Sequence, residues 1–219
     1  LTNLAGANPN RIHAAVQSLI SLGQFEGMVL IVSGDLAAKG SSNEYKNAAT
    51  FLGRFTSTIK ATFGISDQNL KILIVPGNHD LNYGSSARAT PEDIRAYDDA
   101  ETEIHLIDEL NRMADFFSFA DSNKCFFKTK TVPYGQLVTR KILHFSTGYR
   151  IEANLLNTAP FSCGADDGLH FLPEDAIQQL SRPSSADISI TVMHHSPEWF
   201  GFSQRKELEG IIGQRCSMA

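Results

Sequence analysis

Three apolar segments of the chain each end on side chains that can bind a metal ion. The first segment ends on Asp35, the second on Asn78, His79 and Asp80, and the third on His194 and His195. Carboxylate, amide oxygen and imidazole, with no thiolate among them, are ligand types that suit Mn, Fe or Zn. In open α/β sheets, ligands bind outside the carboxyl ends of the strands, where these side chains would lie.

The elements that must position these residues follow an α/β pattern. Helices are predicted over 11–22 and 43–63, with strands over 28–35 and 71–75. The two strands and the helix between them form a β-α-β unit, for which a parallel, right-handed crossover is expected. A further β pattern over 136–149 is followed by a predicted loop region, a short helix to Leu180, a strand from Ile188 that ends on His194 and His195, and a helix over 204–212. Residues 216–219 have the pattern of another strand.

A helical insertion at about 85–133 interrupts this alternation. Its predicted apolar face includes Ile104, Ile107 and Leu110, and its predicted acidic face includes Asp108 and Glu109. Two interpretations stay open. The insertion is either a solvated flank packed on the core or a cap that borders the active site and restricts substrate size.

Length and composition favour one soluble α/β domain. The chain has 219 residues, 42% of them hydrophobic, and a formal charge of −5, which gives no general attraction for nucleic acid or anionic membranes. Its three cysteines are widely spaced and odd in number, which is typical of reduced cysteines in a cytoplasmic protein. No segment approaches the ~20 apolar residues that span a membrane, and the chain does not open with a signal peptide.

The motifs Gly34-Asp35 and Gly77-Asn78-His79-Asp80, with the strand-terminal His194, resemble those of the calcineurin-like metallophosphoesterases. The resemblance implies an α/β fold of two packed mixed β-sheets flanked by helices, a four-layer sandwich, over a single domain of residues 1–219. Ala38 lies where the Ser/Thr protein phosphatases of this superfamily carry an aspartate and the purple acid phosphatases a tyrosine. The chain therefore more closely resembles the bacterial-type phosphoesterases and phosphodiesterases.

The resemblance also implies a role for each residue. Asp35 corresponds to the aspartate that bridges two divalent metal ions, with Mn expected first and Fe or Zn as alternatives. Asn78 and His194 correspond to further metal ligands, and His79 to a catalytic histidine that faces the leaving oxygen without binding metal. His195 projects to the other side of an extended chain, so a supporting role is expected for it. Because Ala38 replaces the usual carboxylate partner of the catalytic histidine, another acid such as Asp80 is expected to orient His79.

The substrate implied is a phosphate ester, and the sequence does not distinguish a nucleotide, a nucleic acid or another ester. Two ligand motifs of the family, Asp-x-His and Gly-His-x-His, are expected before Leu1 and after Ala219, and other domains of a longer chain are possible. A second hypothesis is a sensor or regulatory module that keeps the fold and has lost turnover.

Overall fold

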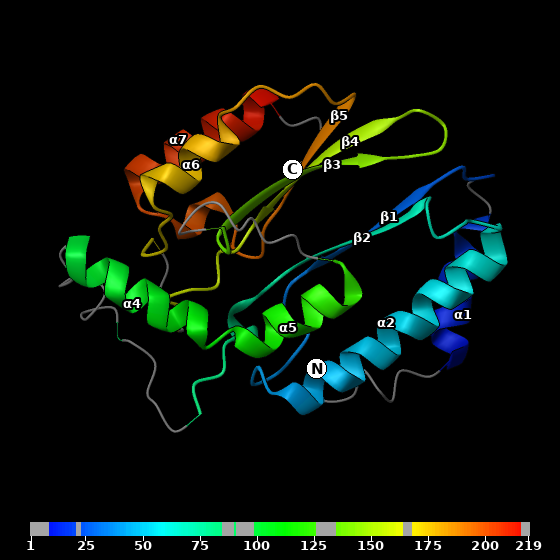
Figure 1. The fold of residues 1–219 in the computed structure, drawn as a ribbon, viewed down its shortest axis with the longest axis horizontal. Helices are drawn as coiled ribbons and strands as arrows, with labels where there is room; N and C mark the ends of the chain where they lie inside the picture. The colour runs from blue at the N-terminus through cyan, green and yellow to red at the C-terminus, as the bar shows by residue number, and fades with distance from the viewer. Residues whose placement is uncertain are drawn as a thin grey trace.

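The computed structural model describes residues 9–20, 23–84, 90, 99–125, 135–163 and 168–215. Two β-sheets face one another in its centre, and helices cover their outer sides (Figure 1). The predicted α/β architecture of two packed sheets flanked by helices is confirmed. None of the described helices combines the length and apolar character needed to cross a membrane.

The first sheet contains the predicted β-α-β unit. Strand β1 (Met28–Ser33) pairs in parallel with β2 (Leu70–Val75), so that Ser33 lies opposite Val75 at their carboxyl ends. Helix α2 (Ser42–Phe63) connects them and packs against α1 (Pro9–Ser18). The predicted end of α2 at Gly64 is confirmed, because this glycine adopts the left-handed conformation (φ 67°) and donates its N–H to the Lys60 carbonyl.

The second sheet has the strand order β3-β4-β5. Strand β3 (Val138–His144) is antiparallel to β4 (Arg150–Leu156), which is parallel to β5 (Ile188–Val192). The loop predicted after Tyr149 is wrong, since this segment is the central strand. Two buried polar residues, Glu152 and Asn154, concealed it, because such residues are uncommon in strands. Each finds a partner on a neighbouring strand: Glu152 pairs with Arg140, and the Asn154 amide donates to Ser189 Oγ at 3.1 Å.

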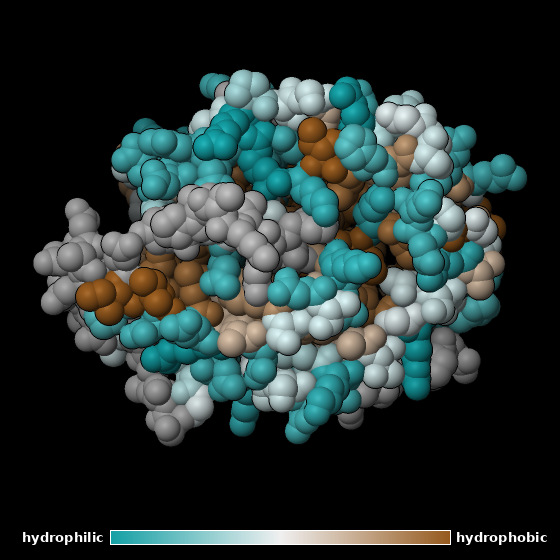
Figure 2. All heavy atoms as spheres, viewed as in Figure 1, coloured by the Kyte–Doolittle hydropathy of each residue, from teal (hydrophilic) through white to brown (hydrophobic). Residues whose placement is uncertain are grey.

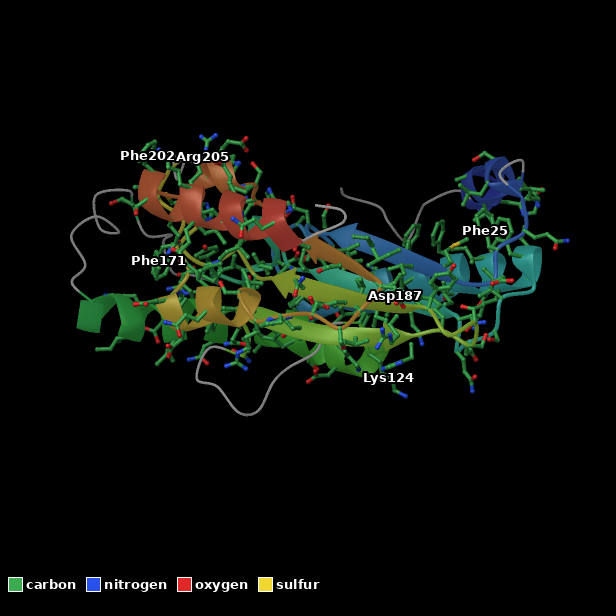
Figure 3. All side chains as sticks on the ribbon, turned by 90° about the horizontal axis from the view of Figure 1, so that it is seen from above. Phe25, Lys124, Phe171, Asp187, Phe202 and Arg205 are labelled. Atoms are coloured by element: carbon green, nitrogen blue, oxygen red, sulfur yellow. The ribbon has the colours of Figure 1, made fainter. Side chains whose placement is uncertain are left out.

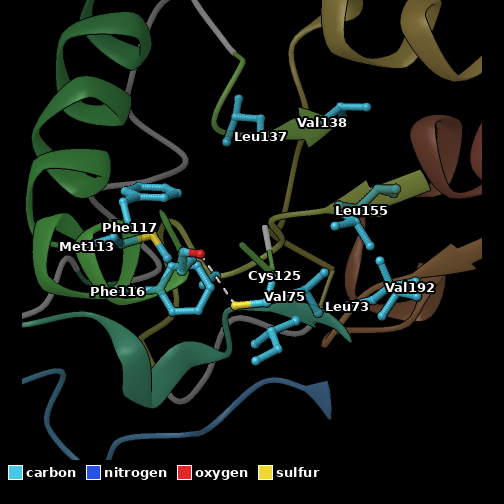
Figure 4. Packing of buried hydrophobic residues seen from close by; sticks show 14 of the residues in the cluster. Leu73, Val75, Met113, Phe116, Phe117, Cys125, Leu137, Val138, Leu155 and Val192 are labelled. Atoms are coloured by element: carbon cyan, nitrogen blue, oxygen red, sulfur yellow. Dashed lines mark hydrogen bonds between the residues drawn. The ribbon is translucent and has the colours of Figure 1, made fainter. Parts of the chain in front are cut away.

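The core lies between the two sheets and beneath α5 (Ala114–Asn123). Leu73 and Val75 of β2 are fully buried and lie near side chains from β4 and β5, including Leu155 and Val192 (Figure 4). Cys125 lies in this core, where burial raises the pKa of its thiol to about 12. It forms no disulfide, which agrees with the prediction of reduced cysteines for this residue. The expected strand at 216–219 lies outside the described residues.

Helices complete the outer layers. On the first sheet, α2 packs with α5, and the Tyr45 and Phe119 rings stack with their centroids 5.4 Å apart. On the second sheet, α6 (Glu174–Leu180) packs on β3. Helix α7 (Phe202–Arg215) follows the short helix η3 (Pro197–Trp199). Figure 3 shows α7, marked by Phe202 and Arg205, at the opposite end of the molecule from Phe25 beside α1.

The insertion contains two described helices, α4 (Asp99–Asn111) and α5, and the predicted faces of α4 are only partly correct: Leu110 is buried and Asp108 is exposed as expected, but the other named residues are not. Ile104 and Ile107 are 61% and 50% exposed, and Figure 2 shows an apolar patch over α4. Glu109 is buried instead: it accepts a hydrogen bond from Phe161 N at 3.2 Å and pairs with Arg112. The reason is that α4 turns Leu106 and Leu110 toward the core, and this rotation carries Glu109 inward.

Candidate active site

The turns after β1 and β2 approach so closely that only glycine fits at two positions. Gly34 has φ 100°, and a Cβ on it would lie 2.8 Å from Gly77 Cα. A Cβ on Gly77 would lie 2.9 Å from His194 Cε1. Asp35, which is not a glycine, also has a positive φ of 58°, a conformation that costs L-residues on the order of 1–2 kcal/mol. Such local strain is common at functional sites.

The Asp80 carboxylate joins these two turns from inside the protein. It is fully buried and accepts four hydrogen bonds: Oδ2 from the backbone N–H of Asp35 (2.9 Å) and Gly77 (2.8 Å), and Oδ1 from Ala37 N–H (3.0 Å) and the Tyr45 hydroxyl (2.8 Å). Burial raises the pKa of the Asp80 carboxyl, against the opposing effect of these donors. Tyr45 shares this environment, and burial raises the pKa of its hydroxyl as well.

The expectation that Asp80 orients the His79 ring is therefore not met. Asp80 faces the interior, whereas His79, the next residue in the short helix η2 (Asn78–Asp80), is exposed. The Nδ1 atom of His79 lies 3.2 Å from the backbone carbonyl oxygen of Ala38. A carbonyl oxygen only accepts hydrogen bonds, so this contact places the ring proton on Nδ1. Ala38, which has no side-chain carboxylate, thus holds the His79 ring through its backbone carbonyl.

Glu44 supports the segment that carries this carbonyl. Its carboxylate accepts hydrogen bonds from the N–H groups of Ala38 (3.0 Å), Lys39 (3.2 Å) and Ser41 (3.0 Å), and from the Ser41 hydroxyl (2.7 Å). Burial alone would raise the pKa of Glu44, but these donors lower it below the usual value. Glu44 was not among the predicted site residues, although a serine followed three residues later by glutamate before an apolar helix is a known helix-start pattern.

The side chains of Asp35, Asn78 and His194 converge at the carboxyl ends of β1, β2 and β5. His194 Nε2 lies 3.2 Å from Asn78 Oδ1 and 3.7 Å from Asp35 Oδ1. His194 Nδ1 lies 2.5 Å from the Ser33 carbonyl oxygen, which requires a proton on Nδ1. In the neutral ring Nε2 therefore presents a lone pair toward two oxygen atoms. Asp35 Oδ1 also accepts the His79 N–H at 3.2 Å, so all four residues of the predicted site lie together.

This donor set fits a divalent cation. A lone pair, an amide oxygen and a carboxylate oxygen repel one another in the absence of a positive charge, and they match the preferences of Mn, Fe or Zn. The described residues contain no group of three or more His, Cys, Asp and Glu side chains that could hold a metal ion. The third donor here is instead the amide of Asn78. The described residues would thus offer a cation one carboxylate, one amide and one imidazole at this position.

The neighbouring residue His195 contacts the His194 ring, with the two ring centroids 4.7 Å apart. Its ring is perpendicular to that of His194 (87°) and is buried beside Trp199 and His170. The two rings are in edge-to-face contact, so the clear difference between the histidines is burial: His195 is 6% exposed, whereas the side chain of His194 is 21% exposed. His170, for which the sequence indicated no role, is 3% exposed and belongs to the same buried group.

A groove of about 630 Å³ adjoins the site but does not contain it. Apolar residues of β1, β5 and α7 form most of its lining, including Ile31, Val192 and Ile212. It reaches the candidate site only through His194, while Asp35, Asn78 and His79 lie outside it. A phosphate group carries charge that this apolar surface would not stabilise, so the groove is not where we place a phosphate ester.

Comparison with known proteins agrees with this geometry. The carboxylate, amide and imidazole lie at strand ends of an α/β fold with two packed sheets. A family model described as calcineurin-like phosphoesterase matches residues 7–211, so the chain belongs to that family. The family supports a phosphoesterase-type hydrolase that uses divalent metal ions. No curated protein matches the chain.

Proposed function

We propose that this chain carries the core of a metal-dependent phosphoester hydrolase with a dinuclear metal site. The observation that supports it is the convergence of Asp35 Oδ1, Asn78 Oδ1 and His194 Nε2 in a member of this family. Two divalent cations, Mn first and Fe or Zn as alternatives, would shield the phosphate charge and activate a water molecule. Three donors are too few for two ions, so the proposal includes the Asp-x-His and Gly-His-x-His motifs of the family elsewhere in the full-length protein.

Each ligand has a distinct task in this proposal. Asp35, with its strained backbone, would help to hold the cations through its carboxylate, whose negative charge would offset their repulsion. Asn78 contributes a neutral oxygen, which leaves the positive charge available to a phosphate. His194 is held by Ser33 with Nδ1 protonated, and this leaves Nε2 ready to bind metal.

His79 is the proposed catalytic residue. The Ala38 carbonyl holds its Nδ1 proton, which leaves Nε2 as the nitrogen that exchanges a proton with the leaving oxygen. Protonation of a leaving group by a positioned side chain typically contributes about 10²–10⁴-fold in rate. A carbonyl stabilises an imidazolium ion less than a carboxylate does, so we expect a lower rate here than with an aspartate partner.

The metal assignment is tested on the full-length protein with an aryl phosphate ester. We expect chelation to abolish hydrolysis and Mn²⁺ to restore it. Asp35→Asn should lose metal and activity together, because the bridging position would then be neutral. Elemental analysis that finds normal metal content in Asp35→Asn would reject the bridging role.

The catalytic assignment is tested by comparing two esters. His79→Gln should retain both metal ions and lose far more kcat on an alkyl ester than on a nitrophenyl ester, since nitrophenolate leaves without a proton. His144→Gln, an exposed histidine at the end of β3, is the matched control and should change neither rate. Equal losses on both esters would instead assign His79 to charge stabilisation on the phosphate, and loss of metal would make it a ligand.

A sensor or regulatory module without turnover is the second candidate, and the observation that favours it is Ala38. A protein that binds metal with high affinity yet hydrolyses no monoester or diester would support this alternative. Testing the protein against monoesters and diesters would also identify the substrate class, which is a nucleotide, a nucleic acid or another phosphate ester. A cytoplasmic location, which the sequence predicts, is checked by fractionating cells that express the protein.

A further inference from the structure

Thr158 connects the chain after β4 to the chain after β5, directly behind the candidate site. The N–H of His195 donates to Thr158 Oγ1 at 3.0 Å, and His195 Nδ1 lies 2.9 Å from the Thr158 carbonyl oxygen. His195 thus contacts Thr158 through both its main chain and its ring. Thr158 is 3% exposed and His195 6%, so water cannot readily replace these bonds.

His170 reinforces this connection from a third segment. Its Nδ1 lies 2.8 Å from the same Thr158 carbonyl, and its ring lies 4.2 Å from that of His195. One carbonyl oxygen therefore accepts a hydrogen bond from both buried rings. Trp199 packs against both of them, and its own carbonyl accepts the His170 N–H at 3.0 Å. Neither the predicted motifs nor the proposed chemistry uses Thr158 or His170.

We propose that Thr158 is a positioning residue that aims His194 at the site, with His195 and His170 held on its carbonyl. The His195 N–H belongs to the peptide group that follows His194, so fixing it fixes the backbone from which the His194 side chain projects. The ring is fixed separately by Ser33 of β1. His194 is therefore held from both sheets, by its ring from the first and by its backbone from the second. The positioning of His194 follows from these hydrogen bonds, and only the statement that His194 binds a metal ion rests on the proposed function.

The hydroxyl of Thr158, and not its shape, carries this role. Thr158→Val keeps the branched shape but leaves the buried His195 N–H without its acceptor. Thr158→Ser keeps the acceptor and removes only a methyl group. Outer residues that orient a metal ligand typically contribute about 10–100-fold in metal affinity. We therefore expect Thr158→Val to lower Mn²⁺ affinity within that range and Thr158→Ser to stay near wild type.

The experiment is calorimetric titration of the full-length protein with Mn²⁺. Thr50→Val is the matched control, because it removes an exposed hydroxyl on α2 that donates to the Lys46 carbonyl. Thr158→Ala is a second hydroxyl deletion, in which no valine branch has to fit, and the same loss is expected. Wild-type affinity in Thr158→Val and Thr158→Ala would overturn the proposal. Equal losses in the Ser and Val variants would also overturn it, since packing would then explain both.

A second measurement separates this proposal from the proposed function. In metal-free protein, nitrogen-15 NMR of the imidazole rings reports the Nδ1–H of His194 that is held by Ser33. We expect this signal to shift or broaden in Thr158→Val and to stay unchanged in Thr158→Ser. If wild-type protein binds no Mn²⁺ and cleaves no ester, the proposed function fails while the NMR comparison still decides the role of Thr158. An unchanged His194 signal in Thr158→Val overturns that role.

Discussion

Replacing Asp80 with asparagine tests whether one buried carboxylate holds the two turns of the site together. The side chain of asparagine keeps one acceptor oxygen and puts an NH₂ donor in place of the other. The favourable orientation puts this NH₂ at the Oδ1 position, because the Tyr45 hydroxyl there can reverse and accept. The Ala37 N–H cannot reverse and is left facing another donor.

The size of the effect follows from this count. A buried donor without a partner costs about 1–3 kcal/mol, so Asp80→Asn should lower the free energy of unfolding by roughly 2 kcal/mol. For a chain of this size that corresponds to a fall in Tm of about 4–8 °C. The opposite amide orientation would leave both Asp35 N–H and Gly77 N–H unpaired and would cost more. The estimate of ~2 kcal/mol is thus the smaller of the two outcomes.

The assay is urea unfolding at pH 7 with a chelator present, so that metal binding does not contribute to the measured free energy. Tyr45→Phe is the matched variant, because it removes one donor to Asp80 and keeps the ring that stacks on Phe119. It should cost about 1 kcal/mol or less. The reasoning is refuted if Asp80→Asn unfolds like wild type, or if Tyr45→Phe proves the more costly change.

Three further outcomes are expected. The pKa of Glu44 is lowered in the folded state, so its stabilising effect is present above its unfolded pKa of ~4.3 and is lost as the pH falls through the folded value. In urea unfolding, wild type should therefore be more stable than Glu44→Gln at pH 7, and this difference should decline below about pH 4. Gly34→Ala should abolish metal binding in calorimetry or prevent folding as seen by circular dichroism, because its Cβ meets the Gly77 backbone. If the insertion at 85–133 is a cap, trimming its acidic helix while keeping α5 should change the ratio of small to bulky ester hydrolysis and spare metal binding; an unchanged ratio would make it a solvated flank.

The sequence predicted the chemistry-bearing residues because their positions depend on strand ends. A parallel β-α-β unit brings the residues after β1 and β2 to one edge, so Asp35 and Asn78 could be placed together before any coordinates. The third residue of the site, His194, could be placed because it follows an apolar segment that has the pattern of a strand. Apolar periodicity and a glycine stop were enough to predict α2 and its end at Gly64.

Other features depend on pairing that a single sequence does not display. Strand β4 was missed because Glu152 and Asn154 are satisfied by Arg140 and Ser189, which are distant in sequence. The faces of α4 were partly wrong because the burial of Glu109 depends on Arg112 and on a loop residue 52 positions away. Periodicity describes a helix by itself and cannot include partners that arrive from other segments.

The orientation of His79 shows that a histidine can still be held in place when the usual aspartate partner is replaced by Ala38. Judged from side chains alone, Ala38 removes the partner of the catalytic histidine. The structure supplies a partner at the same position through the Ala38 carbonyl, whose segment Glu44 holds by three backbone N–H bonds. Main-chain groups are present whatever the residue type, so a loop can preserve ring orientation after the side chain has changed. What a carbonyl cannot replace is the negative charge. The orientation of His79 is therefore retained while the stabilisation of its protonated form is weakened, and the resulting cost falls mainly on esters whose leaving oxygen needs a proton.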